Sequence, residues 1–247
     1  MSLLKADHEE ADTRLILHCI QAPVKTIVVS ARDTDVLLLL VAHFDRIGCT
    51  DLYLKAGTSK DPKFFPVHDI RKSLSDEQVE TLLAFHAITG CDSVSQFSGF
   101  GKRTAWQVFE HHHNDLINLG KGPLTDNVVA SAEKFICKLY GVPEVDTCNE
   151  ARVKLFCQGR SQETLPPTSD AAKFHIMRSH YQATIWNQAH VPQPDFPPVD
   201  EMGWMRVEGQ LVPQLLSLPP IPKAFKEFTS CACTKGCLSQ RCGCRYV

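Results

Sequence analysis

A short run of β-branched residues, followed at once by an apolar helical pattern, constrains this fold more than any other feature. Residues 26–30 read Thr-Ile-Val-Val-Ser, which predicts a buried parallel strand. Apolar residues 36–44 then predict a helix, and residues 51–55 predict a second strand. Residues 64–70 fit a third strand or an extended segment that leads into a short helix. Strands alternating with helices indicate an α/β fold, in which a parallel sheet is flanked by helices.

Further helices precede and follow this sheet. Asp7 with Glu10, and Ser75 with Gln78, have the spacing of a capping box at the start of a helix. The helices that we predict cover residues 1–22, 76–88, 106–119, 127–140 and 170–187. Prolines then become frequent, so residues 141–228 are predicted to be a helical, Pro-rich extension and not an independent globular domain.

Charge and hydropathy narrow the function classes. The net charge of −2 over 247 residues excludes a polybasic nucleic-acid binder as a description of the whole chain, although it allows a local basic patch. No run of 18 apolar residues occurs, so we expect no membrane span. The first residues lack the apolar segment of a secretory signal, and we therefore expect an intracellular protein.

Five acidic residues fall where this fold would gather them. Glu10 and Asp12 lie in the first turn of a helix, Asp33 and Asp35 directly follow the strand at 26–30, and Asp92 follows a helix. Ligands bind at the carboxyl ends of parallel strands, and clustered carboxylates repel one another unless cations neutralise them. Oxygen ligands favour Mg²⁺ or Mn²⁺, and two such ions can drive phosphodiester hydrolysis. Each acid taken alone also fits a helix cap or a solvated side chain, so it is the joint pattern that predicts the metal site.

A Gly-Phe-Gly-Lys-Arg turn follows Asp92 closely. Gly99 and Gly101 would let a phosphate approach the backbone N–H groups at the start of a helix, where the helix dipole favours an anion. Lys102 and Arg103 would add positive charge. An ordinary helix-opening turn has the same composition, and the turn lacks the Walker pattern.

Three motifs together resemble a known nuclease family. His8-Glu-Glu-Ala-Asp12, Ser30-Ala-Arg-Asp-Thr-Asp35 and Thr89-Gly-Cys-Asp92, with the turn at 99–103, resemble the internal region of the flap endonuclease/XPG family of PIN-like nucleases. The resemblance covers about residues 6–140. It implies a PIN-like sheet, a helix-hairpin-helix that grips the duplex backbone, and two divalent cations that cut DNA near branches or flaps.

By position in these motifs, the resemblance assigns a role to each residue. The metal ligands and catalytic residues would be Glu10, Asp12, Asp33, Asp35 and Asp92. The DNA backbone would be held by Gly99, Gly101, Lys102 and Arg103.

The chain departs from the family pattern in two ways. Asp12 stands where the family usually has Glu, which shortens the reach to a metal by one methylene. The family's N-terminal region, with its first strand and two further aspartates, is not found before the acidic pair. We therefore expect that the chain lacks the N-terminal nuclease half and holds a second ion poorly.

Cysteines crowd the C-terminal residues 229–247. The cluster comprises Cys231, Cys233, Cys237, Cys242 and Cys244. Cys-x-Cys pairs between short basic loops suit a zinc-thiolate cluster, and a disulfide knot is the alternative. The stretch resembles half of a tesmin-type CXC domain, a zinc-bound DNA-binding module. His111, His112 and His113 are adjacent on a helix and point in different directions, so we expect a solvated helix end and not a metal site.

The sequence therefore predicts three regions: a PIN-like nuclease domain at 1–140, the extension at 141–228, and a partial CXC zinc module at 229–247. The leading hypothesis is a nuclear, mobile-element-derived, Mg²⁺- or Mn²⁺-dependent DNA endonuclease. One alternative is a catalytically inactive nucleic-acid-binding protein that retains the nuclease fold. Another is a phosphatase or haloacid-type hydrolase with Asp33 as the nucleophile, because an Asp-x-Asp after a strand also occurs there.

Overall fold

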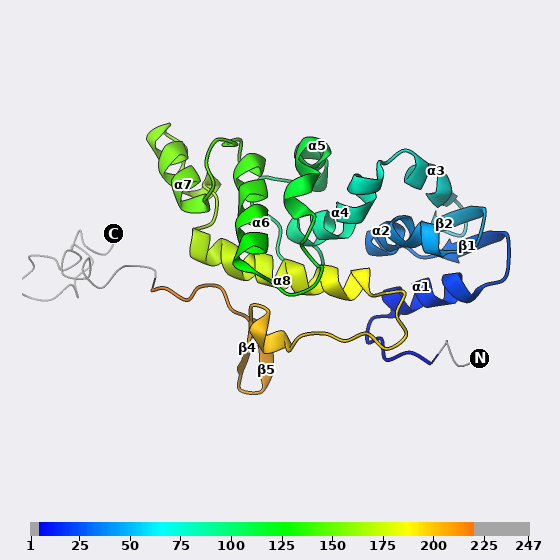
Figure 1. Cartoon of the computed structure of the whole chain (residues 1–247). Coiled ribbons are helices and arrows are strands. Elements are labelled where there is room, and N and C mark those ends of the chain that lie inside the picture. The colour runs from blue at the N-terminus through cyan, green and yellow to red at the C-terminus, as the bar shows by residue number, and fades with distance from the viewer. Residues whose placement is uncertain (1–4, 220–247) are drawn as a thin grey trace, which may run out of the picture. The chain divides into compact units, whose positions relative to one another are not determined.

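A three-stranded sheet lies at one end of the compact unit that extends to Leu215, with helices packed beside it (Figure 1). The computed structural model describes residues 5–219, and a first compact unit extends to Leu215. The strands are β1 (Thr26–Ser30), β2 (Asp51–Gly57), β3 (Pro62–Pro66), β4 (Trp204–Val207) and β5 (Gln210–Pro213). The helices are α1 (Ala11–Gln21), α2 (Thr34–His43), α3 (Val67–Lys72), α4 (Asp76–Ile88), α5 (Lys102–His112), α6 (Asp126–Leu139), α7 (Cys148–Cys157) and α8 (Ser169–Asn187).

The α/β character is confirmed, whereas the prediction of a parallel sheet is wrong for β3. β1 and β2 pair in parallel, with Thr26 opposite Asp51. β3 pairs antiparallel to β2, with Tyr53 opposite Pro66. A short loop joins β2 to β3, and a loop of this length can only reverse the chain. Gly57 opens that loop at φ +84°, where a Cβ atom would lie 2.5 Å from the carbonyl oxygen of Asp61.

Several elements lie where local sequence patterns predicted them. The strand at 26–30 and the helix at 76–88 are confirmed, and so is the Ser75–Gln78 capping box of α4. The Asp7–Glu10 capping box is wrong, because α1 begins only at Ala11 and Glu10 occupies the N-cap position without a side-chain cap. The backbone N–H of Asp7 instead donates to the carbonyl oxygen of Pro192 (3.1 Å).

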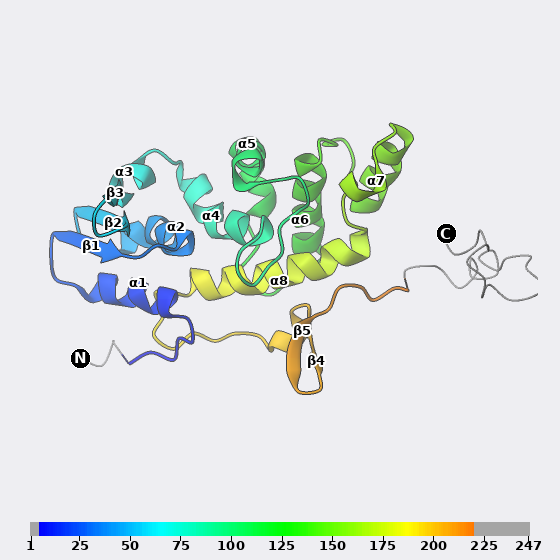
Figure 2. The same ribbon diagram turned by 180° about the vertical axis from the view of Figure 1, so that it is seen from behind.

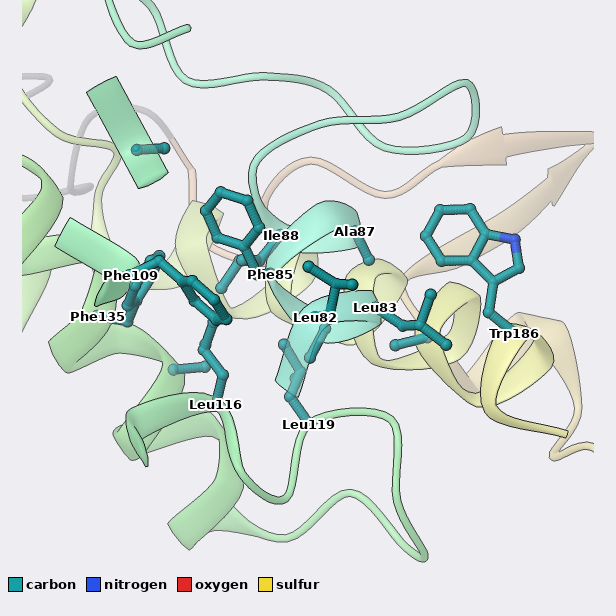
Figure 3. Packing of buried hydrophobic residues seen from close by; sticks show 14 of the residues in the cluster. Leu82, Leu83, Phe85, Ala87, Ile88, Phe109, Leu116, Leu119, Phe135 and Trp186 are labelled. Atoms are coloured by element: carbon teal, nitrogen blue, oxygen red, sulfur yellow. The ribbon is translucent and has the colours of Figure 1, made fainter. Parts of the chain in front are cut away.

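Helix α4 is the centre of the core. Residues 81–89 are all buried, so the second half of α4 is enclosed on every side, whereas its first turn is exposed. Figure 3 shows its apolar side chains packed against side chains of the segments that follow and of α8. The buried residues labelled there are Leu82, Leu83, Phe85, Ala87, Ile88, Phe109, Leu116, Leu119, Phe135 and Trp186.

Helix α8 lies across α4 and α6 in both views (Figures 1 and 2). Its buried polar side chains bind backbone groups of the segments that it crosses. His175 Nε2 lies 2.8 Å from the carbonyl oxygen of Ile88, and His180 Nδ1 accepts from the N–H of Gly120 (3.0 Å). Residues 141–215 thus belong to the same compact unit as the sheet.

Helix α7 and the strands β4 and β5 were not expected from the sequence. Helix α7 opens with a capping box formed by Thr147 and Glu150. β4 and β5 form an antiparallel hairpin whose turn residues, Glu208 and Gly209, both have positive φ. No helix in residues 5–219 is long and apolar enough to cross a lipid bilayer.

A candidate carboxylate active site

A cavity of about 240 Å³ opens between the start of α1, the start of α2 and the loop after α4. Four of the five predicted carboxylates line it: Glu10, Asp12, Asp35 and Asp92. The remaining wall is made by Ala11, Cys91, Ser93, Gln182 and Trp186. The fold therefore brings together acids from three separate stretches of the chain, and α8 closes the cavity on the fourth side.

Electrostatic repulsion acts between these acids. Burial raises the pKa of Asp12 above its usual value, and the neighbouring carboxylates of Asp33, Glu10, Asp35 and Asp92 raise it further. Ionisation of Asp12 is disfavoured because negative charge is concentrated here without a matching cation among the side chains that line the cavity. A bound cation would remove this penalty.

Asp33 lies close enough for its charge to raise the pKa of Asp12, but it does not line the cavity. Its Oδ1 accepts a hydrogen bond from the backbone N–H of Asp35 (3.0 Å), which makes Asp33 the N-cap of α2. Asp33 therefore caps a helix, which was the alternative to metal binding that its position in the sequence allowed.

Asp35 is held by a buried histidine. His86 Nε2 lies 2.7 Å from Asp35 Oδ1, and the side chain of His86 is 6% exposed. The ring of Trp186 stacks on the imidazole with 5.4 Å between ring centroids. A hydrogen bond on one carboxylate oxygen and a stacked ring behind it fix the orientation of Asp35 toward the cavity.

Gln182 of α8 connects two other parts of the wall. Its Nε2 donates to Glu10 Oε1 (2.9 Å), and its Oε1 accepts from Ser93 Oγ (2.6 Å). Both ends of the buried amide are thus satisfied, and Glu10 is positioned by a helix 172 residues away in sequence. Sequence reasoning missed Gln182, His86, Ser93 and Trp186, because no local pattern ties them to the acids.

The Gly-Phe-Gly-Lys-Arg turn begins α5 as predicted. Lys102 is an exposed residue, but its ammonium group contacts the end of α4. Its Nζ donates to the carbonyl oxygen of His86 (2.6 Å) and to Thr89 Oγ1 (2.8 Å), at the C-terminal end of α4. Burial of the ammonium lowers the pKa of Lys102 to about 8. In this arrangement Lys102 Nζ caps the C-terminal end of α4. Gly99, Gly101 and Arg103 are exposed.

The donor set is chemically suited to a hard divalent cation, since carboxylate oxygens are the preferred ligands of Mg²⁺ and Mn²⁺. Their present spacing is not that of a formed coordination shell. Within residues 5–219, no three His, Cys, Asp or Glu side chains are placed so that they could hold one metal ion. The carboxylates would have to close on an ion by side-chain movement.

The predicted zinc ligands Cys231, Cys233, Cys237, Cys242 and Cys244 lie outside the described residues. His111–His113 cross from the last turn of α5 into the following 3₁₀ helix, with His111 exposed.

Comparison with known proteins gives no family assignment. No protein-family model matches the chain, and neither a curated protein nor a solved structure matches it at a significant level. A functional assignment therefore depends on the geometry of the site and on the motif resemblance.

Proposed function

We propose that the protein is a divalent-metal-dependent, structure-specific DNA endonuclease-like hydrolase that acts at the carboxylate cavity. One observation carries the proposal: Glu10, Asp12, Asp35 and Asp92 come from three stretches of the chain and line one cavity, with Asp33 close to Asp12. A purely structural role gives little reason to gather five acids, because their repulsion opposes folding. Function at the expense of stability is typical of active sites.

The cavity-lining acids Glu10, Asp12, Asp35 and Asp92 would hold the ions. When bound, Mg²⁺ or Mn²⁺ supplies a nucleophilic water at neutral pH and stabilises charge on phosphate oxygens. His86 would keep the Asp35 carboxylate aimed at the cavity, and Gln182 would do the same for Glu10. The exposed turn at 99–103 would contact the DNA backbone through its N–H groups and Arg103.

The test is cleavage of a labelled flap DNA by the full chain in Mg²⁺ or Mn²⁺. We expect Asp92→Asn and Asp12→Asn to lower the rate by at least a hundredfold. Asp61→Asn is the matched control, because Asp61 is exposed in the β2–β3 loop, away from the cavity. Equal rates for all variants would contradict the proposal.

A catalytically inactive nucleic-acid-binding protein is the second candidate. Two observations favour it: the spacing of the acids is not that of a formed metal shell, and Lys102 is engaged with α4. This candidate predicts DNA binding without cleavage in any metal. Asp33→Asn separates both candidates from the hydrolase alternative, since only a hydrolase with Asp33 as nucleophile would lose a phosphoenzyme through this change.

A further inference from the structure

A second, larger cavity adjoins the carboxylate site. It measures about 540 Å³ and lies between α8 and the β4–β5 hairpin. The two cavities share Glu10, Ser93 and Gln182 as wall residues, so a ligand that spans the shared wall can touch both. Its volume is within the range of small-molecule and cofactor pockets.

The hairpin turns one particular face toward this cavity. Trp204 and Arg206 line it, and these residues are two apart on β4 and share a face. Leu211, which pairs with Arg206 across the hairpin, lines it as well. Met205 and Val207 alternate with them, lie outside the lining and are 44% and 47% exposed.

A buried arginine attaches the hairpin to α8. Arg178 Nη1 donates to the carbonyl oxygens of Gly203 (3.0 Å) and Gln214 (2.6 Å), which lie together at the open end of the hairpin. Its guanidinium lies 6.0 Å from the centre of the Trp204 ring. Gly203 has φ +80°, and a Cβ atom there would lie 2.7 Å from the carbonyl oxygen of Phe174. This close attachment makes the cavity wall preformed.

The chemistry of the lining changes along the cavity. Tyr181 and Trp204 offer aromatic surfaces, and Ile185, Val199 and Leu211 offer aliphatic ones. Arg206 is the exposed cation of the lining, and its Nε lies 3.3 Å from Asp200 Oδ2 in a pair that is more than half exposed on both sides. An exposed pair of this kind is weak, so an incoming phosphate can replace the carboxylate. Glu9 and Glu10 line the cavity too, and repel a phosphate from their own part of it.

We propose that this cavity binds one nucleotide of a single strand, with the base against Tyr181 and Trp204 and its phosphate on Arg206, next to the carboxylate site. The proposal rests on the proposed function, for which it names the substrate region: an unpaired nucleotide beside the scissile phosphate. Aromatic stacking combined with a nearby arginine is how single-stranded nucleic acids are held without sequence preference. A fully paired duplex keeps its bases stacked inside the helix and cannot place one here.

The test is fluorescence anisotropy of labelled oligothymidylate (dT8) with the full chain. We expect Trp204→Ala to weaken binding by about tenfold, as loss of one stacked base does. Arg206→Gln is expected to weaken binding several-fold and to reduce its salt dependence. Met205→Ala is the matched control on the opposite face of the same strand, and it should bind as the unmodified chain does.

Three results would overturn the proposal: no binding of dT8, binding unchanged by both Trp204→Ala and Arg206→Gln, or equal competition by an octaglutamate peptide. If Trp204→Ala fails to fold, Trp204→Phe and Arg206→Gln decide the question, since the first retains stacking and should bind within about threefold of the unmodified chain.

The endonuclease proposal and the nucleotide-site proposal can be refuted independently of each other. Asp92→Asn is expected to leave dT8 binding intact while it lowers the rate of cleavage by at least a hundredfold. A chain that never cleaves DNA but binds dT8 in a Trp204-dependent way would refute the endonuclease and retain the nucleotide site.

Discussion

His86 and Asp35 lie 51 residues apart in the sequence and meet with 2.7 Å between Nε2 and Oδ1. The contact joins the inner face of α4 to the first turn of α2, at the wall of the carboxylate cavity. A pair in this position has two roles, because it supports the packing and also orients an acid of the proposed active site.

Removal of the histidine is expected to be costly. His86→Ala would leave a void beside Trp186 and deprive Asp35 of its partner, lowering the free energy of unfolding by about 2–4 kcal/mol. Asp35→Asn retains an acceptor for His86 and is expected to cost only about 1 kcal/mol. Urea unfolding followed by circular dichroism measures both, and equal losses would contradict the pairing.

Asp12 should limit stability and be required for cation binding. Because its neighbours and its burial oppose ionisation, Asp12→Asn is expected to raise the melting temperature at pH 7 without added metal. Millimolar Mn²⁺ should raise the melting temperature of the unmodified chain and have a smaller effect on the variant. A cation response of equal size in both chains would argue against Asp12 as a ligand.

Lys102 should produce a rise in stability at alkaline pH. Its pKa is about 8 in the folded protein against a usual 10.5, so between these values the unfolded chain binds more protons than the folded one. The free energy of unfolding should therefore gain a contribution that grows from about pH 8 to pH 10.5. Urea unfolding at a series of pH values gives the free energy of unfolding of the unmodified chain and of Lys102→Met. The difference between the two pH profiles isolates this rise, and a difference that does not change with pH would refute it.

Two buried histidines should make the fold sensitive to acid. Burial lowers the pKa of His43 and of His175 to about 4, from a usual 6.5. The folded protein thus binds fewer protons than the unfolded chain between these values, and stability falls as pH drops from about 6.5 to 4. The loss approaches about 3 kcal/mol for each histidine. His43→Gln and His175→Gln should each flatten the pH profile, whereas the exposed His111→Gln should leave it unchanged.

A pair of glycines allows backbone strain to be separated from crowding. Gly120 and Gly122 both have positive φ, but a Cβ at Gly120 would lie 2.5 Å from Ala183 Cβ, whereas at Gly122 nothing lies within 4 Å. Alanine should cost about 1–2 kcal/mol at Gly122 through conformation alone. At Gly120 it should cost about 1–3 kcal/mol more, because α8 must shift. Thermal unfolding of the two variants gives the comparison.

Prediction from the sequence succeeded where the cause was local. The β-branched run at 26–30 and the Ser75–Gln78 capping box act within a few residues, and both are found where they were expected. The candidate acids could be named because they occur in short motifs, and four of the five line one cavity. β3 could not be given a direction from composition alone, since the length of the preceding loop decides it.

Contacts between distant segments account for what was missed. Gln182 reaches Glu10 across 172 residues, and nothing in either segment indicates the other. The contact of Lys102 Nζ with the carbonyl oxygen of His86 was also not foreseen, because it depends on how the end of α4 lies beside the turn. The β4–β5 hairpin has only four residues in each strand, and its sole local signal is the Glu208-Gly209 turn.

The packing of α8 against α4 sets an order of events during synthesis. α4 ends at Ile88, and α8 does not end until Asn187, so about a hundred further residues must be made before the two can pair. Until then the apolar surface of α4 that α8 will cover is exposed on the nascent chain, and the carboxylates lack one wall of their cavity. A chain halted before Ser169 would therefore present a hydrophobic helix to chaperones or to other chains, and the acids could not act as a site until synthesis had passed Asn187.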